Sequence, residues 1–229
     1  VGIPAREVGE DYYDFIRLGA QRLGLLVADV SGKGTSAAFY IAELKRLILS
    51  LGQIYESPRR LLIEVNRILA ANLDSRSFIE MAYAVVDLET RTLMYARIGH
   101  TPFIYLPRNN GAAPAQVLTP PGLVLGLEGF ETKFEELLEE SFLPIGDGNL
   151  AVLFTDGITE AMDEEWDLFG ETRLSRLVAE HANLPSEGLR ERILRDVEAF
   201  VRSADQHDDM TMVLLKIDAT RTGVVTSQV

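Results

Sequence analysis

The sequence lacks cysteine entirely. This absence excludes disulfide bonds, zinc–thiolate sites and catalytic thiols, and it is consistent with a cytoplasmic location. Long hydrophobic runs are also missing. None reaches the roughly 18 residues that a membrane-spanning helix needs, and no segment resembles a signal peptide. We therefore expect a cytoplasmic protein that does not insert directly into a membrane.

Basic residues are scarce: 22 lysines and arginines stand against 35 aspartates and glutamates, which gives a net charge of −13. This balance argues against binding to nucleic acid or to an anionic membrane surface, because both are recognised mainly through basic side chains. No linker divides the chain, so we expect one domain over residues 1–218 and a polar tail over 219–229. Because residue 1 is valine, we expect the chain to be part of a longer protein whose domain is truncated at its N-terminal edge.

The order of apolar patterns predicts an α+β layered domain. Short apolar runs between turn residues predict strands, and apolar residues at helical spacing predict helices. The predicted strands are 12–18, 22–30, 79–88, 92–98, 102–106, 116–118, 134–142, 150–155 and 210–217. The predicted helices are 35–51, 58–73, 170–181 and 186–201. Hairpin turns dominate and strict strand–helix alternation is missing, which favours antiparallel sheets with helices packed outside.

Acidic residues adjoin the ends of four predicted strands. They are Glu10, Asp11, Asp29, Asp156, Asp208 and Asp209. For any one of these residues, a turn-forming or capping role is the commoner explanation. If the strand ends meet, however, the carboxylates would repel one another strongly. A hard divalent cation such as Mg²⁺ or Mn²⁺, which prefers oxygen ligands, would relieve that repulsion. The set as a whole therefore predicts a metal site.

A glycine-rich loop after Asp29 offers a different interpretation. Gly32, Gly34 and Ala37 follow a predicted strand and precede a predicted helix, as in a dinucleotide-binding motif. That motif requires parallel strands to follow, whereas hairpins follow here. A phosphate-binding P-loop is excluded because Gly34, rather than Ser or Thr, follows Lys33. We therefore expect no affinity for NAD or ATP.

The acidic residues lie in four motifs that occur in a fixed order. Residues 8–14 read VGEDYYD, 29–34 DVSGKG, 155–161 TDGITEA and 208–211 DDMT. Together they resemble the metal-dependent, type 2C-like (PPM) protein serine/threonine phosphatases. Within that superfamily they are similar to the bacterial branch of the stage II sporulation phosphatase SpoIIE and the sigma-factor regulators, as are residues 99–102 and 122–127. The resemblance implies two antiparallel β-sheets in a sandwich flanked by pairs of α-helices, a four-layer αββα arrangement.

The resemblance also implies a centre of two Mn²⁺ or Mg²⁺ ions. Asp29 matches the acid that bridges both ions, and the backbone carbonyl of Val30 matches the ligand beside it. Asp156 and Asp208 match further direct ligands, and Asp11 matches the acid on the side of the second metal. The four aspartates would thus act in catalysis through the bound metals.

Other matches to the superfamily carry departures. Arg6 matches a residue that contacts the substrate phosphate, although a solvated loop cation is the alternative. Glu10 replaces a glycine that the bacterial branch usually has, and could support the centre or crowd it. Asp209 could support the centre through its side chain. Ser31 stands where the wider superfamily has a histidine as the likely general acid, so the leaving group would take its proton from elsewhere, such as water.

The function implied by the resemblance is hydrolysis of phosphoserine or phosphothreonine on a protein by a metal-activated water. The implied substrate is a phosphorylated protein similar to an anti-anti-sigma factor in a partner-switching pathway. An N-terminal sensor region in the longer protein would control the activity. The alternative is a catalytically weak phosphatase-like domain that acts as a protein-binding module. Ser31 and Glu10 motivate it, as does the absence from this chain of the helix and first strand that usually precede the first motif in the family.

Overall fold

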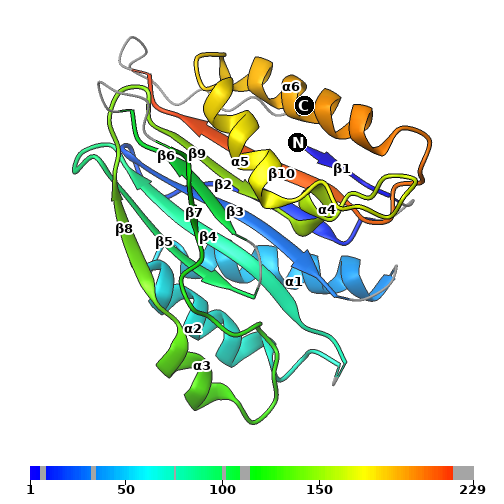
Figure 1. Cartoon of the computed structure of the whole chain (residues 1–229). Coiled ribbons are helices and arrows are strands. Elements are labelled where there is room, and N and C mark those ends of the chain that lie inside the picture. Colours follow the sequence, from blue (N-terminus) through cyan, green and yellow to red (C-terminus); the bar gives the residue numbers. More distant parts are fainter. Residues whose placement is uncertain (6–8, 32–34, 75, 100–101, 109–113, 219–229) are drawn as a thin grey trace.

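The computed structural model describes residues 1–5, 9–31, 35–74, 76–99, 102–108 and 114–218. These residues form two antiparallel five-stranded sheets with helices on their outer faces (Figure 1). The first sheet has the order β2-β3-β4-β5-β8, with bounds Asp11–Arg17, Arg22–Val30, Ile79–Asp87, Thr92–Ile98 and Glu140–Pro144. The second has the order β1-β10-β9-β6-β7, with bounds Gly2–Ile3, Met210–Lys216, Leu150–Phe154, Phe103–Leu106 and Gln116–Leu118. The helices are α1 (Thr35–Leu51), α2 (Pro58–Leu69), α3 (Glu131–Leu137), α4 (Asp156–Thr159), α5 (Glu171–Glu180) and α6 (Ser186–Val201).

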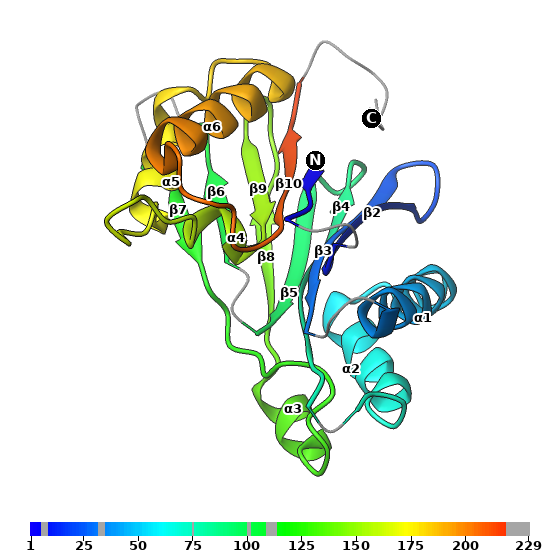
Figure 2. The same cartoon turned by 90° about the vertical axis from the view of Figure 1, so that its right-hand side faces the viewer.

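The sheets and helices form four layers. Figure 2 shows α1 and α2 outside one sheet and α5 and α6 outside the other. Leu44 of α1 and Leu62 of α2 are buried in a cluster with the outward-facing residues of β3 and β4. Leu177 of α5 and Ile193 of α6 are buried in a second cluster, against β9 and β10. The predicted fold class is confirmed.

A third apolar cluster fills the space between the two sheets. Successive side chains of a strand point to opposite faces, so alternate residues of each strand belong to different clusters. In β3, Leu25 and Val27 belong to the cluster between the sheets, whereas Leu26 and Ala28 pack under the helices. By this alternation, Asp29 lies on the inner face, at the point where the apolar filling ends.

The structure corrects one predicted element and adds two. The strand predicted over 134–142 is correct only from Glu140, where β8 begins, because Glu131–Leu137 form α3. Phe134 and Leu138 lie one helical turn apart, and both are buried in the cluster under α1 and α2. The two-residue strand β1 and the single turn of α4 are too short for periodicity to indicate. The predicted turn at 109–111 and the tail at 219–229 lie outside the described residues.

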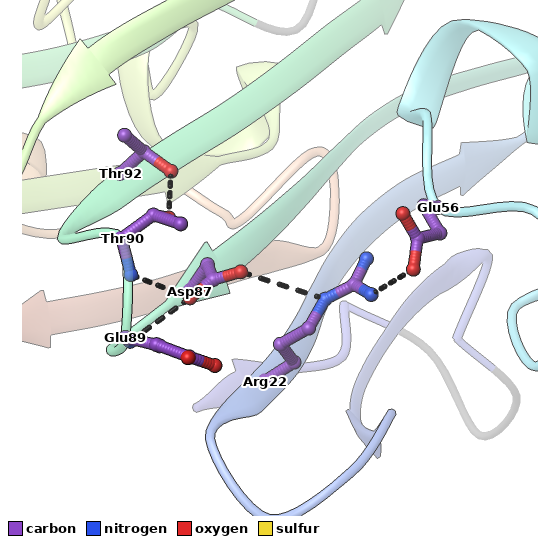
Figure 3. A network of polar contacts seen from close by, with 6 residues as sticks. All are labelled: Arg22, Glu56, Asp87, Glu89, Thr90 and Thr92. Carbon is purple, nitrogen blue, oxygen red and sulfur yellow. Dashed lines mark hydrogen bonds and ion pairs between the residues drawn. The ribbon is translucent and has the colours of Figure 1, made fainter.

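The end of the first sheet away from Asp29 pairs acids with a base (Figure 3). Arg22 lies opposite Asp87, and its guanidinium approaches Glu56 at 2.6 Å and Asp87 at 3.8 Å. Asp87 also accepts hydrogen bonds from the backbone N–H groups of Glu89 and Thr90 in the turn to β5. The hydrogen bond from Thr90 is the main cause that lowers the pKa of the Asp87 carboxyl. Ionised acids are therefore compensated at this end of the molecule.

No helix in the described part of the chain combines the length and the apolar character needed to cross a membrane.

Candidate metal centre

Three acids of the first sheet form a row across neighbouring strands. Asp11 at the start of β2 lies directly opposite Asp29 near the end of β3, and Asp29 lies opposite Glu80 in β4. Directly opposed residues in antiparallel strands point to the same face. The row therefore continues the inner face of the sheet beyond its apolar residues, and it ends at Glu80, which is 7% exposed.

The second sheet brings its own acids to the same end of the sandwich. Asp156 lies two residues after the end of β9, and Asp208 lies two residues before the start of β10. Thr155 joins the two sheets there. Its hydroxyl donates a hydrogen bond of 2.7 Å to Asp11 and accepts one of 3.0 Å from the backbone N–H of Thr211. The Asp11 carboxylate is thus held against the second sheet.

Two glycines allow the acidic segments to approach closely. A Cβ atom at Gly157 would lie 1.9 Å from the backbone oxygen of Asp209, so only glycine fits where α4 passes the start of β10. At Gly99 the backbone has φ +80°, and a Cβ atom would lie 2.6 Å from the side chain of Glu80. A side chain at either position would displace an acid or the backbone beside it.

Asp209 organises the segment that carries Asp11. Its carboxylate is buried and accepts hydrogen bonds from the backbone N–H groups of Ala5 at 2.6 Å, Glu10 at 2.5 Å and Asp11 at 3.2 Å. The backbone oxygen of Glu10 in turn accepts a hydrogen bond of 3.1 Å from the N–H of Val30. Asp209 and the Glu10 backbone therefore connect β10, β2 and the end of β3.

The electrostatics of the cluster disfavour full ionisation. Burial, reinforced by the charges of Asp11, Asp156, Asp208 and Glu80, raises the pKa of Asp29 to about 8. Burial also raises the pKa of Asp11 to about 7, although its hydrogen bonds to two threonines act in the opposite direction. The pKa of Asp156 rises to about 6, again chiefly through burial. Without a cation, the cluster therefore holds protons near neutral pH that a divalent ion would replace.

Asp29 and Asp156 line a common cleft of about 550 Å³. Glu80 and Arg97 also line it, and Phe78 contributes an apolar wall. Neither Glu80 nor Arg97 was singled out in the sequence. The signal available for Glu80 was an acid at the second position of a strand whose next six residues are apolar, but its significance depends on the strand register.

A family comparison identifies the chain. Residues 19–218 match the family described as stage II sporulation protein E (SpoIIE). The chain belongs to the SpoIIE family. One relative is the phosphoserine phosphatase RsbU of Bacillus subtilis, which is 31% identical over 219 residues. That match covers 94% of this chain and 62% of RsbU, so this SpoIIE-family chain spans less than two thirds of its relative.

Solved structures place the fold of this SpoIIE-family chain among PP2C phosphatase domains. The SiaA-PP2C domain of Pseudomonas aeruginosa superposes with a TM-score of 0.81 and 20% identity, over 95% of this chain and 85% of that one. RsbX, solved in complex with magnesium, superposes with a TM-score of 0.66 and 15% identity, over 93% and 91% of the two chains. At these identities the likeness establishes the fold.

The structure of this SpoIIE-family chain places the predicted site residues unequally. It brings Asp11, Asp29 and Asp156 to one end of the sandwich, and Asp208 lies close enough to contribute to the raised pKa of each of them. Val30 follows Asp29 at the end of β3. The predicted phosphate contact, Arg6, lies outside the described residues.

The donors fit a hard divalent cation, because they are carboxylate oxygens with no sulfur among them. Within the described ranges, however, no three acidic or histidine side chains form a ready-made coordination site. The acids are near neighbours whose charges raise one another's pKa, without forming a closed coordination shell.

Proposed function

We propose that this chain is the phosphatase domain of a protein that removes phosphate from phosphoserine or phosphothreonine, and that residues 1–218 form this domain. The observation that carries the proposal is the group of Asp11, Asp29 and Asp156 at one end of the sandwich, each with a raised pKa. Two of these acids line a cleft. Membership of the SpoIIE family and the 31% identity to RsbU, a phosphoserine phosphatase, support the same activity.

The proposed cofactors are two Mn²⁺ or Mg²⁺ ions. Asp11, Asp29, Asp156, Asp208 and the backbone carbonyl of Val30 would hold them. Bound ions of this kind lower the pKa of a coordinated water and offset negative charge that develops on a transferring phosphoryl group. The magnesium bound by RsbX, which shares the fold, supports this choice of metal.

The surrounding residues hold the acids in place. Thr155 holds the carboxylate of Asp11 in place by a hydrogen bond from its hydroxyl. Asp209 and Glu10 would support the centre without binding the metals, because Asp209 accepts hydrogen bonds from backbone N–H groups of the segment that carries Asp11. Removing such supporting contacts typically lowers metal affinity or activity by about 10–100-fold.

Ser31 is not suited to protonate the leaving group. Its hydroxyl donates a hydrogen bond of 2.8 Å to the backbone oxygen of Phe78 and accepts one of 2.6 Å from the N–H of the same residue. These bonds tie the end of β3 to the segment before β4. The proton for the departing serine or threonine alkoxide therefore comes from water on this proposal.

We propose as substrate a phosphorylated protein similar to an anti-anti-sigma factor, in a partner-switching pathway. We also propose a longer protein in which an N-terminal sensor region controls the phosphatase domain; RsbU, of which this chain covers 62%, is itself longer than the chain. On this proposal the phosphorylated side chain of the substrate would enter the cleft of about 550 Å³, and the rest of the substrate protein would lie over its mouth. Nucleic acid is not an expected partner, because the net charge is −13.

A second candidate is a catalytically weak phosphatase-like domain that binds a partner protein. It is favoured by the lack, among the described residues, of three acids in a ready-made coordination arrangement.

An activity assay separates the two candidates. Hydrolysis of p-nitrophenyl phosphate and of a phosphoserine protein is measured while Mn²⁺ is titrated and then removed with EDTA. We expect turnover that saturates with Mn²⁺ and disappears with EDTA. No turnover at saturating Mn²⁺, in this chain and in a longer protein that includes the N-terminal region, would favour the binding module.

A further inference from the structure

Arg97 stands out because it is a cation in an acidic cleft. It lies near the end of β5, opposite Ala82 of β4. Tyr95 and Leu93, two and four residues earlier, belong to the apolar cluster between the sheets, so Arg97 shares that inner face. Among the described residues that line the cleft with Asp29 and Asp156, it is the only basic one.

The Arg97 side chain is anchored from the wall of the cleft. Its Nε donates a hydrogen bond of 3.0 Å to the backbone oxygen of Pro120. The segment that carries Pro120 packs tightly on β5, since a Cβ atom at Gly122 would lie 2.0 Å from the backbone oxygen of Arg97. A guanidinium carries five N–H groups in one plane, so four remain beside the one that holds the side chain in place.

The charges around Arg97 permit two roles. Glu80 and Glu171 lie near enough to favour its charged form, so Arg97 could serve only as their counter-ion. A lysine at position 97 could act as a counter-ion to these two acids equally well. A planar guanidinium is distinctive because it can donate two parallel hydrogen bonds to two oxygens of one phosphoryl group. Its place on the cleft wall with Asp29 and Asp156 puts these donors beside the proposed centre.

We propose that Arg97 binds the phosphoryl oxygens of the substrate and orients the phosphate towards the centre at Asp29. The inference rests on the proposed phosphatase function, and it adds a contact from β5 to the one predicted for Arg6. Without such a cation, a doubly charged phosphoryl group would enter a cleft whose wall also carries Glu80, Glu160 and Glu171. Arg97 offsets that repulsion where the substrate phosphate enters.

The test compares wild type with Arg97→Gln and Arg97→Lys. The measurements are the inhibition constant of inorganic phosphate, KM and kcat for p-nitrophenyl phosphate, and the thermal unfolding temperature. Arg17→Gln is the matched control, because it removes the same charge from an exposed site at the opposite end of β2.

We expect Arg97→Gln to weaken inhibition by phosphate and to raise KM by about tenfold or more, as for the loss of a charge-assisted hydrogen bond. Arg97→Lys should fall between Arg97→Gln and wild type, since it keeps the charge but loses the paired donors. Arg17→Gln should match wild type in both constants.

If wild type is active and Arg97→Gln has an unchanged inhibition constant for phosphate, the inference is overturned. A lowered unfolding temperature of Arg97→Gln would then show that Arg97 acts only as a counter-ion. If Arg97→Gln does not fold, Arg97→Lys decides: inhibition equal to wild type would overturn the inference. An inactive wild type at saturating Mn²⁺ would instead overturn the proposed function, and the inference with it.

Discussion

Asp29 combines properties that a packing role does not require. Its strand neighbours Ala28 and Val30 are fully buried, and the acid itself lies opposite Asp11 on one side and Glu80 on the other. Its pKa is raised to about 8, mainly by burial and then by the neighbouring acids. Keeping a carboxyl group in such a place destabilises the ionised form unless a cation accompanies it.

Replacing Asp29 with asparagine tests the proposed role directly. The side chain keeps its size but loses its charge and a metal-binding oxygen. Since the loss of supporting contacts alone costs about 10–100-fold, we expect Asp29→Asn to lower kcat/KM in Mn²⁺ by more than about 100-fold. In EDTA at about pH 8 the same variant should unfold at a higher temperature than wild type, because it removes a repelled charge.

Asp147→Asn is the control for Asp29→Asn. Asp147 is exposed and lies in the turn before β9, away from the centre. It should leave both the activity and the unfolding temperature close to wild type. Full activity in Asp29→Asn would refute the metal assignment, whatever the stability result.

Only some residues of the cluster can be recognised from their local sequence. Asp11, Asp29 and Asp156 attract notice in the sequence because each adjoins an apolar strand beside a turn or glycine. Glu80 and Arg97 lie inside strands, where a charged residue is more often a solvated one. Their inward position follows from the register of β4 with β3 and of β5 with β4, which the residue itself does not reveal.

At the scale of elements, α2 shows how local sequence signals set a boundary. Ser57 caps the helix and Pro58 occupies its first turn. The Ser57 hydroxyl accepts a hydrogen bond of 3.2 Å from the N–H of Arg60 and donates one of 2.7 Å to Glu140 in β8. The N–H of Arg59 donates to the same Glu140 oxygen at 3.0 Å. The cap therefore also joins α2 to the edge strand of the first sheet.

Ser57→Ala should remove both contacts. We expect a loss of about 1 kcal/mol in the free energy of unfolding, as for other helix caps. For a chain of this length that corresponds to a fall of about 2–4 °C in the unfolding temperature. Ser175→Ala is the control, since the hydroxyl of Ser175 bonds only within its own helix, to the Glu171 backbone oxygen. Equal unfolding temperatures for the two variants would contradict the capping role.

Elements with strong periodicity were predicted well. The bounds of α1 and α6 agree with the prediction, as do those of β3 and β5. The prediction of a strand is wrong over 134–139, because apolar residues in and just after a seven-residue helix resemble a short strand. There, packing of Phe134 and Leu138 against α2 and its neighbours selects the helix.

At the scale of the whole molecule, the acid cluster couples stability to pH. In the folded chain the pKa values of Asp11, Asp29 and Asp156 are raised to about 7, 8 and 6, whereas the ordinary pKa of an aspartate is 3.8. Between these values the folded state holds more protons than the unfolded state. Stability from this source is therefore present below about pH 4 and is lost as pH rises through about 6 to 8.

We accordingly expect the unfolding temperature in EDTA to fall between about pH 5 and pH 8, and Mn²⁺ to restore it at the upper end. Differential scanning calorimetry at several pH values, with EDTA or Mn²⁺, measures both effects. The negative net charge acts in the same direction, so Asp29→Asn isolates the contribution of the cluster. Its advantage over wild type should shrink towards pH 5. An advantage independent of pH, or no stabilisation by Mn²⁺ at pH 8, would contradict the prediction.

The sequence by itself determined the layered α+β class, most element bounds and the oxygen-rich chemistry of the centre, because each depends on patterns within a few residues. Only the tertiary structure decided which side chains meet. Thr155 contacts Asp11 across 144 residues of sequence, and Asp209 contacts Asp11 across 198. Such contacts depend on the register of paired strands and on how one sheet lies over the other. Local periodicity contains no information about either. Glu80 and Arg97 can therefore be recognised as residues of the site only from the tertiary structure.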